Sequence, residues 1–400
     1  MKVIALLLAF ISVAAATPLP HDDGAQFPLG GLSSNHPGFD LDLAAPRLVQ
    51  LEGKGEPIVM TEFEKIVAKA RGVRFFDVSD TPLLGSRAHF RALRTRSYPD
   101  PHNTETVTAV IETLDARNLK VELDRFTRFY TRYYCSLFGK EAQKWLLKRI
   151  NEITQTFAPE PLRSVISVQE FTHPWPQSSI IVRINGTSST DDGVVILGAH
   201  LDSTSTSPFD RAPGADDDGS GSMNILEAYR VLIAAGFRPE RTVEFHWYSG
   251  EEGGLLGSQA VAQDYEQRDV NVIAMSQYDM TAWVKRGTPE QVGIVTDYTD
   301  PTLTEFNKKL VDLYLDIPWV ETECGHAICS DHESWRKAGY PGIFTVESDY
   351  KHINREYAHT ENDRYDISDE FSFTHMLEFS KLAVAFAIEL GGWSREWESN

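Results

Sequence analysis

The sequence has little positive charge, few cysteines and few long hydrophobic runs. Its 400 residues include 38 Lys and Arg against 58 Asp and Glu, and the resulting net charge of -20 would repel a phosphate backbone. Beyond the first residues, no stretch reaches the roughly 18 uninterrupted apolar residues that a membrane helix requires. Nucleic-acid binding and a membrane span are therefore not expected.

Enough hydrophobic residues are present to form a large core. They make up 42% of the chain and charged residues only 24%, a composition that excludes a wholly disordered protein. The length suits one folded domain with an appended segment, and we find no internal repeat. We expect the protein to be a monomer.

The N-terminus has the features of a secretory signal peptide. MKVIALLLAFISVAAATPLP begins with one Lys, continues with an apolar run from Val3 to Val13 and then has small residues. A membrane anchor is the alternative, but the run is too short to cross a bilayer. We predict that residues 1–17 are a signal peptide and that the protein is secreted.

The residues that follow the signal peptide lack the pattern of a core. Residues 18–45 are rich in Pro, Gly, Asp and Ser, and the charged stretch after them has one short amphipathic segment, residues 61–70. We predict that residues 18–85 are a pro-segment that is removed, and that residues 86–400 form a single folded domain. The alternative is an N-terminal extension that stays attached.

The folded domain alternates between strand and helix patterns. An amphipathic helix pattern at residues 222–236 ends at Gly236, and a last helix is expected over residues 371–390. This alternation predicts an α/β fold with a largely parallel sheet covered on both faces. The strands are predicted from apolar or β-branched runs at residues 179–184, 194–199, 243–248 and 272–278.

Three of these predicted strands lead into side chains that bind zinc in proteins. One runs directly into His200, the next into the pair Glu251 and Glu252, and the last into Asp279. Ligands of open α/β sheets bind beyond the carboxyl ends of the strands. We therefore expect these side chains at a common edge of the sheet.

A loop of three adjacent acids, Asp216, Asp217 and Asp218, contributes further carboxylates. Neighbouring carboxylates repel one another, so the cluster indicates a nearby cation or a helix N-terminus. Asp218 or Ser220 is a suitable N-cap for the helix that follows, but a cap requires only one acid. The sequence alone does not rank the three as metal ligands.

His359, in the segment YAHTENDR, is a candidate for a second imidazole ligand. A single loop histidine is more often a surface residue than a ligand. However, two ions with one bridging carboxylate need about one imidazole and one further carboxylate each. His200, His359, Glu252 and Asp279 complete that set.

Taken together, these segments resemble a known family. GAHLDS, PGADDDGSG, SGEEGGLLGS, QYDM, CGHAICSDHESW and AHTEND are similar to segments of the secreted bacterial and fungal leucine aminopeptidases, which are two-zinc exopeptidases. The likeness covers roughly residues 95–395, and RLVQLEGKGEPIVMTEFEK resembles the pro-region of the fungal members. The resemblance implies a catalytic domain with a mixed, mostly parallel sheet between helices.

The resemblance also implies a role for each candidate residue. It implies that Glu251 is the general base and that Asp202 orients His200. The implied ligands are His200 and Asp279 for one zinc ion, Glu252 and His359 for the second, and Asp217 as the bridge between them.

The activity implied by the resemblance is removal of the N-terminal residue, leucine or another hydrophobic residue, from peptides with a free amino group. Zinc lowers the pKa of a bound water to about 7, and a glutamate can then take up the proton of this water. The alternatives are a related zinc enzyme of carboxypeptidase or glutaminyl cyclase type, and a binding module without activity. Hydrolysis of substrates with a free amine distinguishes between them.

The cysteine-containing loop departs from the family pattern. It places His326 where the family usually has a Tyr that contacts substrate, and it is one residue longer. Cys324 and Cys329 are close enough in sequence to pair in an oxidising compartment, which leaves Cys135 without an assigned role. Asn185 begins the sequon Asn-Gly-Thr and is a candidate for N-glycosylation.

Overall fold

The computed structural model describes residues 36–52, 55–92, 97–190, 193–325 and 328–394. The predicted signal peptide, most of residues 18–45 and His326 lie outside these ranges. Among the described residues, no helix is both long and apolar enough to cross a membrane.

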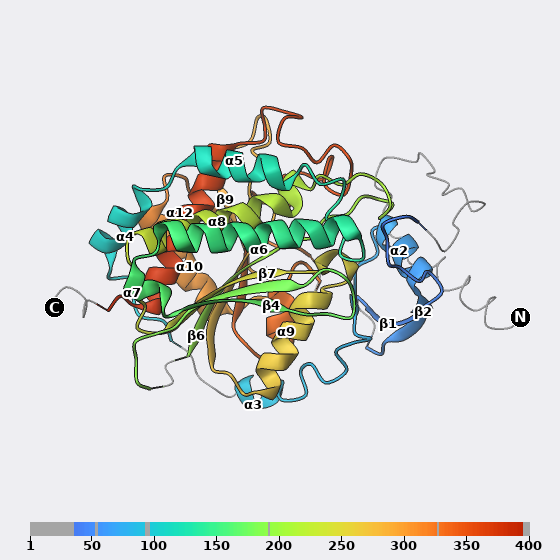
Figure 1. Cartoon of the computed structure of the whole chain (residues 1–400), viewed down its shortest axis with the longest axis horizontal. Helices are drawn as coiled ribbons and strands as arrows, with labels where there is room; N and C mark the ends of the chain where they lie inside the picture. Colours follow the sequence, from blue (N-terminus) through green and yellow to red (C-terminus); the bar gives the residue numbers. More distant parts are fainter. Residues whose placement is uncertain (1–35, 53–54, 93–96, 191–192, 326–327, 395–400) are drawn as a thin grey trace, which may run out of the picture. The chain divides into compact units, whose positions relative to one another are not determined.

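The fold is centred on an eight-stranded mixed sheet with the strand order β10-β9-β11-β8-β6-β7-β5-β4 (Figure 1). The pairs β6–β7, β6–β8, β8–β11 and β9–β10 are parallel, whereas β4–β5, β5–β7 and β9–β11 are antiparallel. The predicted mixed, mostly parallel sheet is therefore confirmed. The strands are β4 (Ile166–Phe171), β5 (Ser179–Ile184), β6 (Val194–His200), β7 (Thr242–Tyr248), β8 (Val272–Tyr278), β9 (Val292–Val295), β10 (Trp319–Thr322) and β11 (Gly342–Val346).

Helices cover both faces of this sheet, which is why its central strands are hydrophobic on both sides. In β6, every residue is buried. Val195 and Leu197 belong to the large core on one face, and Val194 and Ile196 to a second core on the other, as the alternation of side chains along a strand requires. This arrangement is the predicted α/β architecture.

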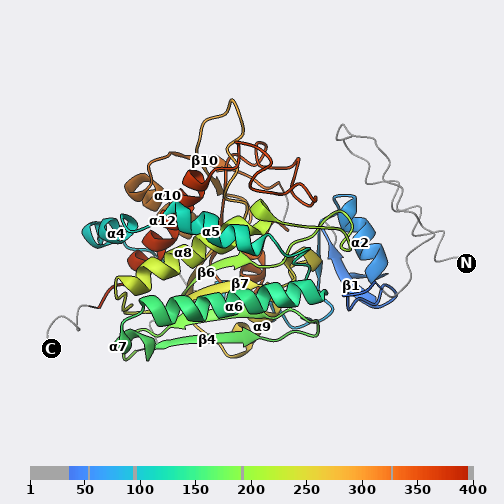
Figure 2. The same cartoon turned by 45° about the horizontal axis from the view of Figure 1, so that its top comes forward.

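The larger core is formed mainly by long amphipathic helices that run across one face (Figure 2). Ser136 and Ser372 cap two of them, each accepting a hydrogen bond from a backbone N–H of the first turn. The helices on this face are α4 (Thr104–Ile111), α5 (Ala116–Phe126), α6 (Leu137–Phe157), α8 (Gly221–Ala234), α10 (Pro301–Tyr314) and α12 (Phe373–Gly391). The short helix α7 (Glu160–Arg163) follows α6.

The second core lies between the sheet and two further helices, α9 (Leu256–Gln267) and α11 (His332–Lys337). Trp335 of α11 is fully buried there and donates a hydrogen bond from its indole nitrogen to the Tyr248 hydroxyl, 2.9 Å away. This contact connects α11 to the end of β7, one of the strands that lead into the predicted ligands.

Residues 46–77, inside the predicted pro-segment, form a small sheet of their own. Its strand order is β2-β1-β3, all antiparallel, with α2 after β2. Thr61 and Glu64 form a capping box that fixes the start of α2. The elements are β1 (Pro46–Leu51), β2 (Ile58–Thr61), α2 (Glu62–Ala70) and β3 (Phe75–Asp77), and α3 (Ala88–Ala92) follows them.

We predict that Gly221, the first residue of α8, is required for the close approach of this helix to the end of β8. A Cβ atom there would lie 2.1 Å from the Tyr278 carbonyl oxygen, so Gly221→Ala should lower the stability by about 1–3 kcal/mol. Thermal unfolding measures the effect. Gly55→Ala is the matched control, because a Cβ at that position meets no atom within 4 Å. Equal melting temperatures for the two variants would contradict the prediction.

Candidate metal centre

The candidate ligands lie where the parallel strands β7, β6 and β8 end next to one another in the sheet. His200 is the last residue of β6, and Asp279 follows β8 directly. After β7 the chain turns through Gly250, whose φ is +74°, into a short 3-10 helix, η2 (Glu251–Gly253). The strand-end prediction therefore placed these residues at the correct edge.

Two groups of three side chains meet at this edge and share one carboxylate. His200 Nε2 lies 3.1 Å from Asp217 Oδ1 and 3.7 Å from Asp279 Oδ1. His359 Nε2 lies 2.9 Å from Asp217 Oδ2 and 3.1 Å from Glu252 Oε2. Each group has ligand atoms close enough together to hold a metal ion. The structure thus brings together all five candidate ligands.

The chemistry of these side chains fits metal cations. Among the described residues, Glu252 Oε1 and Asp279 Oδ1 are buried and accept no hydrogen bond. Burial acts to lower the pKa of His359, but Glu252 and Asp217 raise it to about 10. The carboxylates therefore attract positive charge to the position of His359, and a metal bound there would replace that proton.

The structure distinguishes the three adjacent acids that the sequence could not rank. They lie in the irregular segment η1 (Ala215–Ser220) before α8. Asp218 accepts hydrogen bonds from the backbone N–H groups of His200 and Gly221, at 3.0 and 2.8 Å. Asp216 accepts from the Ala282 backbone and the Asn354 side chain. Only the middle acid of the three, Asp217, faces both imidazoles.

Asp202 holds the glutamate pair in position. Its two carboxylate oxygens accept the backbone N–H groups of Glu251 and Glu252, each at 3.1 Å. One of them also lies 3.5 Å from His200 Nδ1, and the Asp202 carbonyl oxygen lies 3.2 Å from the same ring nitrogen. The contact to the glutamates was not anticipated from the sequence, because the two segments are about 50 residues apart.

Two residues that the sequence reasoning did not single out connect the loops of the site. The buried guanidinium of Arg132 donates to the carbonyl oxygens of Leu201, Pro213 and Gly214. Asp363 accepts hydrogen bonds from the Asp216 and Asp217 backbones at 2.9 and 3.0 Å. Because Asp363 is four residues after His359, it ties the loop of one ligand to the backbone of another.

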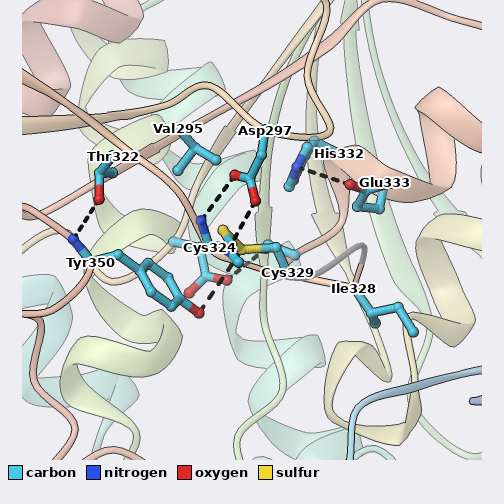
Figure 3. Close-up of a disulfide and its surroundings, with 12 residues drawn as sticks. Val295, Asp297, Thr322, Cys324, Ile328, Cys329, His332, Glu333 and Tyr350 are labelled. Atoms are coloured by element: carbon cyan, nitrogen blue, oxygen red, sulfur yellow. Dashed lines mark hydrogen bonds and ion pairs between the residues drawn. A yellow bond between two sulfur atoms is a disulfide. The ribbon is translucent and has the colours of Figure 1, made fainter. Parts of the chain in front are cut away.

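The predicted disulfide between Cys324 and Cys329 is present (Figure 3), and the residue after it contacts the centre. Asp297 accepts the backbone N–H of Cys324, and Ser330, the residue after the disulfide, donates to Asp279 Oδ2 at 2.6 Å. Cys135 is buried and forms no disulfide bond. No sequence motif predicts the contact between Ser330 and Asp279.

Residues from the predicted pro-segment also reach the centre. Lys69 of α2 donates hydrogen bonds to the backbone oxygen and to the Oε2 atom of Glu252. Farther along, Phe76 and Val78 pack against Leu255 and Ile328. An ammonium group of this segment therefore touches one of the five candidate ligands.

Fold and site together define a class of protein. A mostly parallel α/β sheet carries, at its carboxyl edge, two His and carboxylate groups joined by one shared carboxylate, and this is the arrangement of a two-metal hydrolase.

Comparisons with known proteins identify the family within this class. The model of peptidase family M28 matches residues 179–384. The chain is 42% identical over 402 residues to leucine aminopeptidase 1 of Pyrenophora tritici-repentis, with 98% of each chain covered, and 41% identical over 390 residues to that of Trichoderma harzianum, with 94% of each covered. The protein therefore belongs to peptidase family M28, in the group that includes the fungal leucine aminopeptidases.

Solved structures agree with this assignment. The LapA aminopeptidase of Legionella pneumophila is 28% identical and superimposes with a TM-score of 0.76, covering 88% of this chain and 100% of its own. Glutaminyl cyclase of Porphyromonas gingivalis, at 17% identity and a TM-score of 0.54, shares the fold alone. The family expected from the motifs is thus confirmed.

We predict that Asp363 is needed to hold the Asp217 loop. Asp363→Ala leaves two backbone N–H groups without their acceptor, and we expect a loss of about 2–4 kcal/mol in unfolding free energy. Thermal unfolding in a chelator measures this loss without a contribution from bound metal. Asp366→Ala removes an exposed ion pair with Arg364 and should change the stability by less than about 1 kcal/mol. A similar loss in both variants would contradict the prediction.

Proposed function

We propose that this protein is a secreted aminopeptidase that uses two zinc ions to remove hydrophobic N-terminal residues from peptides. The observation that carries the proposal is the pair of ligand groups that share Asp217, with Glu251 beside them. The identity with fungal leucine aminopeptidases over nearly the whole chain supports it.

In the proposed assignment, each ion has one imidazole and one carboxylate of its own. His200 and Asp279 would hold the first ion, Glu252 and His359 would hold the second, and Asp217, which faces both imidazoles, would be shared by the two. When bound, zinc lowers the pKa of a coordinated water and polarises the carbonyl of the scissile bond. Ser330 and Asp202 keep Asp279 and His200 oriented through the hydrogen bonds and contacts described above.

Glu251 is the proposed general base. It is not a member of either ligand group, and its backbone is fixed by Asp202. Burial raises the pKa of Glu251 well above its usual range, whereas the positive charges of His200 and Lys69 lower it. A carboxylate of raised pKa is a better proton acceptor, so Glu251 can take a proton from water and deliver it to the leaving amine.

A preference for hydrophobic first residues is supported by the identity with fungal leucine aminopeptidases, and an apolar cluster lies next to Asp279. Met280 follows Asp279 and packs against a buried cluster that includes Val295, Phe344, Val346 and Tyr350. The disulfide forms part of the same cluster (Figure 3).

Secretion is supported by three features of the chain. Residues 1–17 have the signal peptide pattern, and a disulfide fits an oxidising compartment. The sequon residue Asn185 is exposed and follows the end of β5, where a glycan would extend into solvent. We propose that Asn185 carries an N-glycan.

We predict that Glu251→Gln retains zinc and loses activity. Turnover of leucine p-nitroanilide should fall by about 10²- to 10⁴-fold, because the amide cannot accept the proton of water. Zinc content by plasma mass spectrometry should be unchanged. As a control for the aminopeptidase proposal, the wild type should leave N-acetylated leucine p-nitroanilide intact. Full activity of the variant would show that another group is the base, and loss of zinc would show that Glu251 is a ligand.

We also propose that residues 18–85 are a pro-segment that must be removed. Its strands β1, β2 and β3 form a small separate sheet, and its helix α2 contacts the centre through Lys69. Beyond the proposed boundary, Arg91 is anchored to α9 and the residues after it by hydrogen bonds to the Glu266 carbonyl and Asp269. This contact fits a mature chain that begins near residue 86.

N-terminal sequencing of the active secreted protein tests the boundary. We expect the first residue near position 86, because the anchored segment can stay with the catalytic domain after cleavage. Intact mass measurement provides an independent check of the length. A mature protein that begins before Arg47 would show that the extension is permanent.

A further inference from the structure

Lys69 makes the deepest contact of the pro-segment with the metal centre. It lies in the last turn of α2, and its ammonium group donates to the Glu252 backbone oxygen at 2.6 Å and to Glu252 Oε2. The Glu252 side chain is 1% exposed and that of Lys69 is 26% exposed. The tip of a surface helix thus reaches an almost completely buried carboxylate.

This position is held by the packing of α2 and is not a chance surface contact. Lys65, one helical turn earlier, is buried between Glu62 and Asp77, at 2.8 and 2.9 Å from their carboxylates. After α2, Arg74 donates to the Ile328 carbonyl oxygen and Phe76 packs in the same cluster. These contacts hold α2 against its own small sheet and join the residues after it to the catalytic domain.

The oxygen that Lys69 contacts is a ligand atom of the second metal group. Glu252 Oε2 lies 3.1 Å from His359 Nε2, and His359 in turn lies 2.9 Å from Asp217 Oδ2. An ammonium group at this oxygen supplies positive charge where the second ion would supply it. Two cations at one carboxylate oxygen repel each other, so they compete for it.

His200 and Asp279 of the first metal group do not receive the hydrogen bonds of Lys69. Among the described residues, the hydrogen bonds of Lys69 go to Glu252, and none goes to His200 or Asp279. These two residues are at the other side of the shared Asp217. Lys69 is therefore hydrogen-bonded to a ligand that belongs to the second metal group alone.

We infer that Lys69 is an internal cation that holds Glu252, a ligand of the second metal group, in the precursor, so that the precursor binds one zinc ion and takes up the second when the pro-segment leaves. The inference rests on the two-zinc assignment proposed above. Because Lys69 is tethered to the same chain, its effective concentration at Glu252 is high, and zinc in solution competes poorly. After cleavage this tether is lost and the second ion gains access.

Zinc stoichiometry of the unprocessed chain tests the inference without any measurement of activity. The chain from residue 18 to 400 is folded with excess zinc, dialysed, checked by intact mass and analysed by plasma mass spectrometry. We expect about one zinc ion per wild-type precursor and about two per Lys69→Met precursor, since methionine keeps the volume but removes the charge. Lys69→Arg keeps the charge and should stay near one.

Lys337→Met is the matched control. Lys337 also lies against the pro-segment, with its ammonium group 4.7 Å from the centre of the Phe76 ring, but it has no contact with the five candidate ligands among the described residues. This variant should bind the same amount of zinc as the wild-type precursor. Circular dichroism confirms that each variant is folded.

The outcomes separate this inference from the proposed function. Two ions in the wild-type precursor, or one ion in folded Lys69→Met, would overturn the role of Lys69. If the mature protein also binds two ions and cleaves leucine p-nitroanilide, the proposed function stands without this inference. If the mature protein binds fewer than two ions, the two-zinc assignment itself is wrong.

Discussion

The contact of one carboxylate with two imidazoles is the interaction on which the rest of the site depends. Asp217 is nearly buried, and its two oxygens lie 3.1 Å from His200 Nε2 and 2.9 Å from His359 Nε2. These histidines come from a strand end and from a loop more than 150 residues later. A buried carboxylate among other acids is costly unless its charge is compensated nearby, so the surrounding segments must supply that compensation.

The fold compensates the negative charge of the acids around Asp217 by giving each of them its own hydrogen-bond donors. Asp218 receives backbone N–H groups at the start of α8, and Asp363 receives those of the Asp217 loop. The guanidinium of Arg132, buried among carbonyl oxygens, adds a fixed positive charge close to these carboxylates. With its neighbours satisfied in this way, Asp217 is left to face the two imidazoles, and metal ions bound there would replace the protons that the carboxylates attract to them.

The difference between positions set by the strand pattern and positions set by distant partners explains how much of the site could be predicted from the sequence. Parallel strands place their carboxyl ends at one edge, so His200, Glu252 and Asp279 could be predicted as neighbours from the pattern of strands alone. The choice of Asp217 could not be derived from the residues, because it depends on distant partners such as Asn354, which turns Asp216 away. The family resemblance gave that choice, and the structure supplies its physical reason. The contacts of Lys69 and Ser330 join segments that no local pattern connects.

The concentration of acidic ligands at the centre also constrains the precursor. The acidic ligands must come together during folding, before a second divalent ion is required for activity. The repulsion between their negative charges opposes this approach. If the pro-segment is removed as we propose, its lysine reduces the repulsion at Glu252 in the precursor without becoming a permanent part of the site. A lysine in the catalytic domain would not leave and would compete with zinc in the mature enzyme as well. In the proposed precursor, the location of Lys69 on α2 would therefore link assembly of the centre to the later release of Glu252, through the charge of one ammonium group.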